Sequence, residues 1–424
     1  MIIPLICALI ILFFAGLPVA IAISTATLLL ILFTTNLPLI VVPQQMFSGI
    51  DTTILLAIYF FVLAGNIMTA GTLSKRLIRL INSFIGGFHG GLAITSVIGC
   101  MFFAAISGSS PATVIAMGSI MIPALTKEGY SHRFSLGLLT SAGSLGILIP
   151  PSIPMIIWAL VMSVSVTEQF IAGIVPGIIL GLGFMFFSYF LSKKREWGAK
   201  NKCNLYEIRS ALKEGIWGLF MPVVVLGGIY TGVFTPTEAS AVAVILALFI
   251  EICIHQNLSL KMIPNIILES AILGSTILFI ISAAVAFSWY LNFMQIPNVL
   301  AEWLTATINQ KWLFLLLLNL AFLVLGCFVD LISAMLVLGP IFLPTLIEFN
   351  INPLHFGIIM VVNIEIAFLT PPFGINLYVA SGVTKRPLGE TASAVLPFLI
   401  MMYGILFLIT YVPDLSLFLV NLLR

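Results

Sequence analysis

The chain has 424 residues, of which 61% are hydrophobic and only 8% charged, and its mean hydropathy is +1.22. Soluble domains carry about 25% charged residues, so this composition excludes a soluble enzyme or receptor and predicts an integral membrane protein built from helices. The formal net charge of +2 provides no basic surface for nucleic acid.

The first half of the chain divides into helices around two interruptions. Two short helices separated by Pro18 precede a membrane span and a basic surface helix. A re-entrant hairpin of two half-segments, a span broken at Pro150-Pro151 and a closing helix follow. The predicted ranges, in that order, are 2–15, 18–33, 52–71, 74–86, 91–106 with 111–126, 134–165 and 168–192.

After a basic linker at 193–214, the same order of elements is predicted a second time. The ranges are 215–231, 237–254, 266–291, 296–309, 312–327 with 334–348, 354–384 and 390–421. Proline spacing supports this repeat, because four prolines of the first half each have a partner 221 residues later. They are Pro123, Pro150, Pro151 and Pro176, with Pro344, Pro371, Pro372 and Pro397. Repeats whose helices break at matching places are typical of secondary transporters.

A re-entrant hairpin does not cross the membrane, so each half is predicted to cross five times. An odd number of crossings inverts the second half relative to the first. The sequence therefore predicts an all-α integral membrane protein of two inverted five-span repeats. The repeats are 1–192 (hairpin 91–126, broken helix 134–165) and 215–424 (hairpin 312–348, broken helix 354–384).

The basic residues indicate how these repeats lie in the membrane. If the linker 193–214 is cytoplasmic, the predicted topology makes 15 of the 17 Lys and Arg residues cytoplasmic and leaves Lys311 and Arg424 outside. Such a bias is what the positive-inside rule requires. We therefore expect a multi-pass protein of the bacterial inner membrane with both termini in the periplasm.

Four predicted breaks lie at membrane depth, two hairpin tips and two Pro-Pro breaks, at 107–111, 144–152, 327–333 and 369–376. Backbone there is tolerated only where protein or a water-filled cavity satisfies its polar groups. Carbonyls freed at the end of a half-helix suit a hard cation such as Na⁺, and freed amides suit a carboxylate. We therefore expect two Na⁺ sites, each pairing a tip with the break of its own half, and no other cofactor.

The residues expected at these sites are the polar and small residues of the breaks. Sodium site 1 is predicted at Ser107, Gly108, Ser109, Ser110, Ser144, Gly146 and Pro150. Sodium site 2 is predicted at Gly326, Asp330, Ser333, Thr370 and Pro371. The substrate is expected at Ser110, Pro151, Ser152, Pro372 and Asn376.

Three acidic residues lie within or beside the interrupted helices. Asp330 fits two roles, a cation ligand or the cap of the following half-helix. Glu238, just after Pro236, is interpreted as a first-turn acid of its helix. Glu365 lies within the broken span, and the sequence is compatible with pairing inside the bundle or with facing water.

These motifs resemble the large membrane subunit of tripartite ATP-independent periplasmic (TRAP) transporters, the DctM-type permease family. The matching strings are Phe61-Val62-Leu63-Ala64-Gly65, Ser107 to Thr113, Ile149 to Pro154, Phe234 to Ala239, and Thr370-Pro371-Pro372. The resemblance implies Na⁺-driven import of a small organic acid, a C4-dicarboxylate or a sialic-acid-like carboxylate. The hairpins and broken helices would move as an elevator, and the family's Na⁺ sites at tips and adjoining breaks would fall on the residues given above.

The same resemblance implies two protein partners. A soluble periplasmic substrate-binding protein would deliver the substrate, and a small four-helix membrane subunit, expected as a separate chain, would support this one in the lipid bilayer. A self-sufficient Na⁺/dicarboxylate symporter or ion antiporter of related fold is the alternative. An intramembrane serine hydrolase at Ser107-Gly108-Ser109 is disfavoured, because no His or Lys lies within an apolar span to act as its base.

Overall fold

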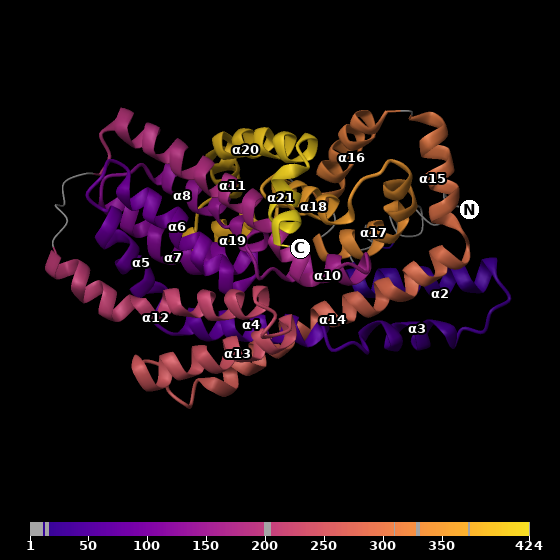
Figure 1. Ribbon diagram of the computed structural model, residues 1–424, viewed down its shortest axis with the longest axis horizontal. Coiled ribbons are helices and arrows are strands. Elements are labelled where there is room, and N and C mark those ends of the chain that lie inside the picture. The colour runs from indigo at the N-terminus through magenta and orange to yellow at the C-terminus, as the bar shows by residue number, and fades with distance from the viewer. Residues whose placement is uncertain are drawn as a thin grey trace.

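The computed structural model describes residues 12, 17–198, 205–308, 310–327, 331–371 and 374–423. Every regular element among these residues is a helix, and the helices form two layers (Figure 1). The first, called here the long-helix layer, is packed around α14, which contacts α2, α3 and α4. Its members are α2 (Val19–Thr34), α3 (Val41–Ile50), α4 (Leu55–Ala70), α12 (Leu205–Tyr230), α13 (Pro236–Phe249) with the π-helical turn η1 (Ile250–Ile254), and α14 (Ile263–Phe293).

The second layer, called here the hairpin layer, holds both predicted hairpins and both broken helices. Its first-half members are α6 (Gly91–Ser107), α7 (Ser110–Lys127), α8 (His132–Ala142), α9 (Leu145–Leu148), α10 (Ile153–Val161) and α11 (Val166–Arg195). Its second-half members are α16 (Lys311–Gly326), α17 (Leu331–Glu348), α18 (Pro353–Phe368), α19 (Ile375–Thr384), α20 (Leu388–Tyr411) and α21 (Asp414–Leu423). The connecting helices α5 (Leu73–Ile85) and α15 (Ile296–Thr307) lie at opposite ends of the molecule (Figure 1).

Seven helices of the described residues are long and apolar enough to cross a membrane. The number is eight if α3 and α4, which meet at a bend of 57°, count as one span. One of the seven is 132–161, the first predicted broken span. The chain is therefore a multi-span helical protein, and the inverted relation of its two halves stays a prediction.

Several predicted boundaries were wrong. The closing helix predicted at 390–421 is two helices, α20 and α21, because Pro413 has no N–H to continue the first. The linker predicted at 193–214 is shorter, since α11 continues to Arg195 and α12 begins at Leu205. Helix α3 was not predicted, because Pro43, Gln44 and Gln45 interrupt its apolar pattern. The predicted helix 2–15 lies almost entirely outside the described residues.

The surface helix α5 was predicted as amphipathic, and it buries one face, including Leu73, Leu77 and Leu80. Helix α12 packs against that face through glycine, since a Cβ on Gly215 would lie 2.7 Å from Leu80 Cβ. The start of α5 is held by Glu251 of η1, a fully buried residue whose Oε1 accepts hydrogen bonds from Thr72 N (2.9 Å) and Leu73 N (2.7 Å). A side chain 179 residues away along the chain thus caps the surface helix.

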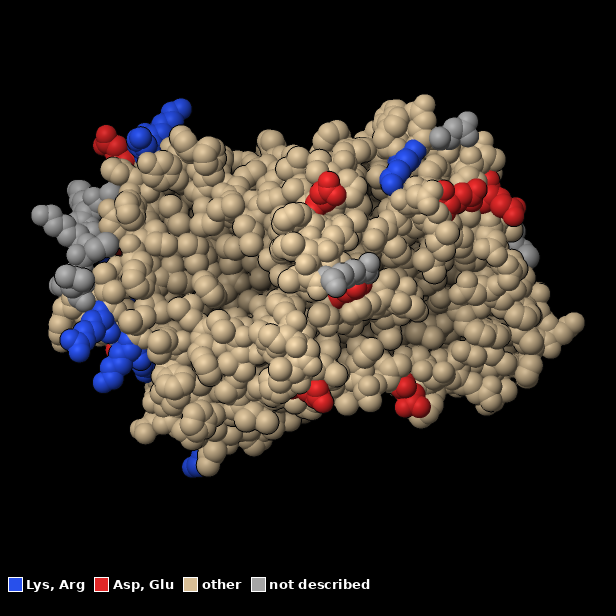
Figure 2. All heavy atoms as spheres, in the orientation of Figure 1, with Lys and Arg blue, Asp and Glu red and all other residues tan. Residues whose placement is uncertain are grey.

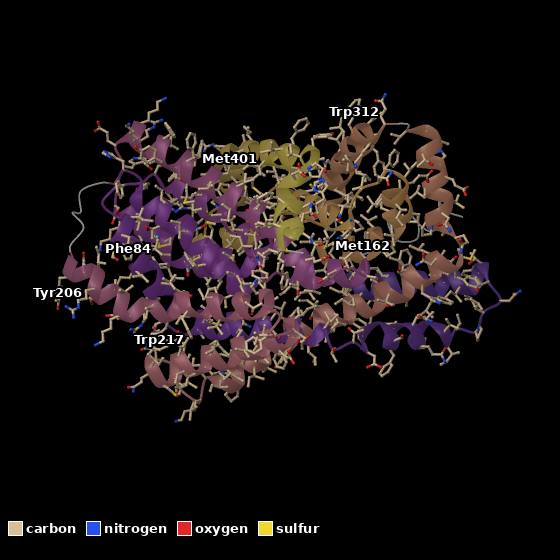
Figure 3. All side chains as sticks on the ribbon, viewed as in Figure 1. Phe84, Met162, Tyr206, Trp217, Trp312 and Met401 are labelled. Carbon is tan, nitrogen blue, oxygen red and sulfur yellow. The ribbon has the colours of Figure 1, made fainter. Side chains whose placement is uncertain are left out.

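Lys and Arg side chains gather at the end of the molecule where α5 and the start of α12 lie (Figure 2). Phe84 of α5 and Tyr206 of α12 lie at this same end (Figure 3). Glu214 of α12 pairs there with Arg79 at 3.1 Å and with Arg76 at 3.6 Å. These basic side chains are among those from which the positive-inside rule predicts a cytoplasmic linker, and the side of the membrane stays a prediction.

The interpretation of Glu238 as a first-turn acid is confirmed. Thr235 Oγ1 accepts a hydrogen bond from Glu238 N (3.3 Å), and Thr235 N donates one to Glu238 Oε2 (2.8 Å), which together form a capping box before α13.

Replacing Thr235 with valine is expected to lower the thermal unfolding midpoint Tm by about 1–2 °C, because one N-terminal N–H of α13 loses its acceptor. Thermal unfolding of the purified protein in detergent, followed by tryptophan fluorescence, measures the change. Thr276→Val is the matched control, since that exposed hydroxyl only donates to Ile272 O within its own helix. Equal Tm values for the two variants would show that the capping box does not stabilise α13.

Candidate functional site

The first hairpin reverses its direction between Ser107 and Ser110. Gly108 ends α6 with φ +60°, a left-handed conformation that glycine adopts without strain, and Ser109 is extended at the start of α7. Ser107 Oγ lies 3.2 Å from Ser109 O and 3.3 Å from Thr113 Oγ1, and Thr113 Oγ1 donates to Ser109 O at 2.8 Å. The tip therefore gathers three oxygen atoms, one carbonyl and two hydroxyls.

The first Pro-Pro break lies against this tip, as the sequence predicted for the two elements of one half. A Cβ on Gly146 would lie 2.6 Å from both Ser109 O and Thr113 Oγ1. Ile153 N donates to Gly108 O at 3.3 Å, and a Cβ on Gly108 would lie 3.0 Å from Pro151 O. The break leaves the backbone of the tip and the start of α10 in direct contact.

The serine hydroxyls of the first break donate hydrogen bonds to backbone carbonyls three to five residues earlier in the chain. Ser152 Oγ donates to Ile147 O at 2.6 Å, and Ser144 Oγ donates to Ser141 O at 2.5 Å. Both serines are fully buried. The two hydroxyls therefore bond to backbone carbonyls of the helices before the Pro-Pro pair, Ser144 to α8 and Ser152 to α9.

In the second half, the end of α16 lies against α18. A Cβ on Gly326 would lie 2.6 Å from Ala367 Cβ, and Ser333, near the start of α17, is buried. Thr370 Oγ1 donates to Ile366 O at 2.8 Å, and Pro371 is exposed. Of the residues predicted for this half, Asp330 and Pro372 lie outside the described residues.

A polar cluster joins the two halves. Ser110 Oγ, in the first turn of α7, donates to Glu365 Oε1 of α18 at 2.6 Å. Asn376 Nδ2, at the start of α19, donates to Glu365 Oε1 and to Ser110 Oγ, each at 2.7 Å. Ser110 and Asn376 are 0% exposed and Glu365 is 2% exposed. The tip of the first hairpin thus contacts the break of the second half as well as that of its own.

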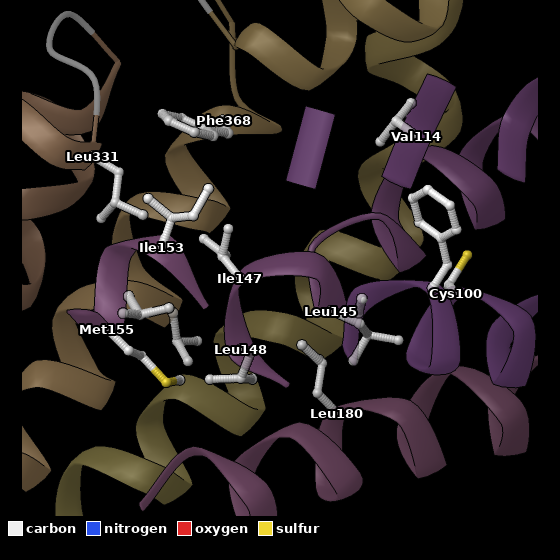
Figure 4. Close-up of a cluster of buried hydrophobic side chains, with 14 of the residues drawn as sticks. Cys100, Val114, Leu145, Ile147, Leu148, Ile153, Met155, Leu180, Leu331 and Phe368 are labelled. Atoms are coloured by element: carbon white, nitrogen blue, oxygen red, sulfur yellow. The ribbon is translucent and has the colours of Figure 1, made fainter. Parts of the chain in front are cut away.

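Apolar side chains enclose these breaks. Figure 4 shows Ile147 and Ile153 of the first break in one buried cluster with Leu331 and Phe368 of the second half. Helix α10 contacts α17, and α9 contacts α18. Ser110, Ser152 and Asn376 are all buried, so these three of the predicted substrate residues have no surface open to a ligand in this structure.

Three residues at the site were not predicted or were left without a role. Thr113 and Gly65 belong to the matching motifs, but no role was predicted for either, because threonine or glycine inside an apolar helix carries no distinct local signal. At Gly65, α4 meets the tip, since a Cβ there would lie 3.1 Å from Ser107 Cα. Glu365 pairs within the bundle, which was one of the two possibilities that the sequence allowed.

The family described as "Tripartite ATP-independent periplasmic transporter, DctM component" matches residues 6–415 of this chain. The chain belongs to this family. The DctM assignment makes the protein a subunit of a secondary transporter and not an enzyme, in agreement with the predicted membrane class and with the resemblance of the motifs.

Relatives support the assignment over the whole chain. The C4-dicarboxylate TRAP transporter large permease protein DctM of Rhodobacter capsulatus is 41% identical over 429 residues, covering 98% of each chain. The isethionate TRAP transporter permease protein DctMQ of Oleidesulfovibrio alaskensis is 40% identical over 404 residues, which are 95% of this chain and 64% of that relative.

The fold is also found in a solved transporter with little sequence similarity. The YdaH transporter of Alcanivorax borkumensis superimposes with a TM-score of 0.61 at 16% identity, covering 87% of this chain and 86% of that one. At this identity the likeness concerns the fold alone.

Proposed function

We propose that this DctM-family chain is the large permease subunit of a Na⁺-coupled, binding-protein-dependent importer of a small organic acid. The observation that carries the proposal is the contact of the first hairpin tip with Pro-Pro breaks from both halves, at Gly146 and at Asn376. Helix ends interrupted within the membrane offer carbonyl oxygens to a cation and N–H groups to an anionic substrate, and the first tip and the two breaks place several such helix ends close together.

A C4-dicarboxylate is the proposed substrate. The relatives from Rhodobacter and Oleidesulfovibrio are named for a C4-dicarboxylate and for isethionate, and both are small organic anions. Donors at the starts of α7 and α19, including Ser110 and Asn376, suit an anionic group because helix N-termini carry partial positive charge. A sialic-acid-like carboxylate remains the second candidate, since it presents the same anionic group.

Sodium is the proposed coupling ion. Ser107 Oγ, Ser109 O and Thr113 Oγ1 are hard oxygen ligands that lie close together at the tip of the first hairpin, and such ligands suit a hard cation. Two sites are proposed, the first at the tip near Ser107 and Gly146, the second between Gly326 and Thr370 with Asp330. When one net positive charge enters the cell with the substrate, the membrane potential adds a driving free energy of about 2.3 kcal/mol per 100 mV.

An elevator movement of the hairpin layer against the long-helix layer is the proposed mechanism. Ser110, Ser152 and Asn376 are buried in this structure, so substrate access to them requires the tips to open or the whole layer to shift. Coupling then follows if substrate binds best when Na⁺ has ordered the tips. The proposed partners are a periplasmic substrate-binding protein and a small four-helix membrane subunit, and the relative named DctMQ, longer than this chain, is compatible with the second.

Uptake of labelled succinate into proteoliposomes tests the proposal. The liposomes contain this chain with its small membrane subunit, and uptake is measured with and without an inward Na⁺ gradient and with and without the binding protein. Uptake that requires both is expected. Uptake without the binding protein would favour a self-sufficient symporter or antiporter, and uptake of sialic acid alone would change the substrate class.

Replacing Ser107 with alanine is expected to raise the Na⁺ concentration for half-maximal uptake several-fold, because the Ser107 hydroxyl is one of the three proposed sodium ligands at the first tip. Ser119→Ala, in the same hairpin, is the control, since the Ser119 hydroxyl donates to Ala116 O away from the tip. An unchanged Na⁺ dependence in Ser107→Ala would remove this side chain from the sodium site.

A further inference from the structure

An apolar groove that the proposed transport cycle does not use lies between α6 and α11. Its volume is about 670 Å³. The residues that line it are Ile94 of α6 and Leu182, Gly183, Met185, Phe186 and Tyr189 of α11. Leu182 and Phe186 are more than half exposed, so the groove is open to the surroundings of the protein. From Leu182 to Tyr189 it follows α11 for about 10 Å.

The packing of the two helices fixes the position of this groove. Helices α6 and α11 contact each other, and glycines bring them close together at two levels. A Cβ on Gly181 would lie 2.7 Å from Met101 Sδ, and a Cβ on Gly90 would lie 3.0 Å from Ser192 Cβ. Gly181 and Ser192 stand on either side of the groove residues of α11. The groove therefore belongs to a packed pair of helices and not to a loop.

This side of α11 is suited to contact with lipid. Helix α11 is one of the helices that are long and apolar enough to cross a membrane. Its exposed residues recur every four positions, and all of them are apolar: Ile178, Leu182, Phe186 and Phe190. They form a stripe that faces away from the other helices. Hydrocarbon is the favourable occupant of an apolar groove on such a face, because water finds no polar partners there.

Basic side chains lie at one end of the groove. Lys193, Lys194 and Arg195 end α11, and all three are exposed. Lys193 Nζ lies 6.0 Å from the centroid of the Tyr189 ring, which places the ammonium group next to a residue that lines the groove. No ion pair joins these three residues to an acidic residue in the described part of the chain. Figure 2 shows Lys and Arg side chains at the end of the molecule where α11 ends in Figure 1.

The groove and the positive charges together match the two parts of a phospholipid. The macrodipole of α11 favours basic residues in its last turn, so Lys193 to Arg195 alone do not indicate a ligand, and the acidic Glu196 that follows offsets one of their charges. An apolar groove that leads to these charges is an independent observation. Basic pockets between membrane helices attract anionic lipid head groups. A helix of another protein would cover the groove but would leave the positive charges without an anion.

We propose that the groove between α6 and α11 binds one anionic phospholipid of the surrounding membrane. One acyl chain lies along Leu182, Phe186 and Ile94, and the phosphate lies at Lys193 and Lys194. The lipid would hold the start of α6, the first arm of the first hairpin, against α11. A faster uptake in anionic membranes would follow, and this consequence alone rests on the proposed function.

Lipid binding to the purified complex of this chain with its small membrane subunit tests the site. The complex in detergent is titrated with palmitoyl-oleoyl-phosphatidylglycerol, and bound lipid is counted by native mass spectrometry. Phosphatidylcholine with the same acyl chains provides a zwitterionic comparison, and inorganic phosphate provides the anion without chains. Lys193→Gln combined with Lys194→Gln removes the charges beside the groove, and Ile94→Trp fills the groove without changing any charge.

Each variant has a matched control. Lys75→Gln combined with Lys385→Gln removes two charges from exposed lysines elsewhere. Ile178→Trp adds the same bulk on the exposed stripe of α11 outside the groove. Both controls should bind phosphatidylglycerol as the wild type does.

The double lysine variant is expected to need an at least tenfold higher concentration of phosphatidylglycerol for half-saturation and to lose the preference over phosphatidylcholine. Ile94→Trp is expected to weaken the binding of both lipids at least fivefold. Wild-type affinity in the double lysine variant, equal wild-type affinity for the two lipids, or displacement of the lipid by inorganic phosphate would each overturn the inference. If Ile94→Trp cannot be purified, the exposed lysine pair decides.

The titration contains neither Na⁺ gradient nor substrate, so its outcome is independent of the proposed transport activity. Loss of lipid preference in the wild type would remove the groove site and leave sodium-coupled uptake untested by this experiment's result. Absence of Na⁺-dependent uptake with intact lipid binding would instead refute the proposed function and keep the lipid site.

Discussion

Replacing Gly146 with alanine is expected to lower substrate uptake at least tenfold while the protein still folds and inserts. The added Cβ would lie 2.6 Å from both Ser109 O and Thr113 Oγ1, a distance at which the tip of the first hairpin must move away from its break. A displacement of about 1 Å at a binding site is enough to reduce rates by roughly a hundredfold. Initial uptake rates in proteoliposomes measure the effect.

Gly118→Ala is the matched control for this prediction. Gly118 lies in α7 of the same hairpin, but the nearest atom to a new Cβ there is Ile122 Cδ1 at 3.6 Å, an ordinary van der Waals contact. Its uptake should equal that of the wild type. If Gly146→Ala also transports normally, the tip is not held by close contact with the first break.

Replacing Glu251 with alanine is expected to destabilise the protein by roughly 2–4 kcal/mol. Its carboxylate is fully buried and accepts hydrogen bonds from Thr72 N and Leu73 N, so its loss leaves two backbone donors at the start of α5 without an acceptor. Thermal unfolding in detergent should show a lower Tm, and hydrogen exchange should be faster across α5.

Glu214→Ala is the control for this second prediction, since Glu214 also holds α5 but through partly exposed ion pairs with Arg76 and Arg79. Such pairs contribute about 0–1 kcal/mol. A destabilisation by Glu214→Ala as large as that by Glu251→Ala would mean that charge pairing, and not the buried cap, holds the surface helix.

The sequence predicted those features of the fold that have local causes. The polar run Ser107–Ser110 between two apolar segments predicted a hairpin turn, and Pro150-Pro151, which lack an N–H, predicted a helix break; the structure confirms both interruptions. The same local chemistry identified the first-turn role of Glu238. The basic amphipathic pattern was likewise sufficient to predict α5.

Features that depend on which helices meet could not be predicted from the sequence. Glu365 has no local partner, and its contacts with Ser110 and Asn376 exist only because α7 packs against α19. The role of Glu251 was missed for the same reason, since its partner helix lies 179 residues earlier. The break at Pro413 has a local cause and could have been predicted, because proline lacks the N–H that would continue a helix. The apolar run 390–421 was instead interpreted as a single helix.

The pairing of Ser110 with Glu365 has a consequence for how the chain is made. Their separation is 255 residues, and at about 5–20 residues per second a ribosome needs roughly 13–50 s to pass from one to the other. During that interval the Ser110 hydroxyl, at the tip of the first hairpin, lacks the Glu365 carboxylate that accepts its hydrogen bond. A nascent chain that stalls before residue 365 would therefore expose this tip to quality-control proteases, although all its earlier helices are already complete.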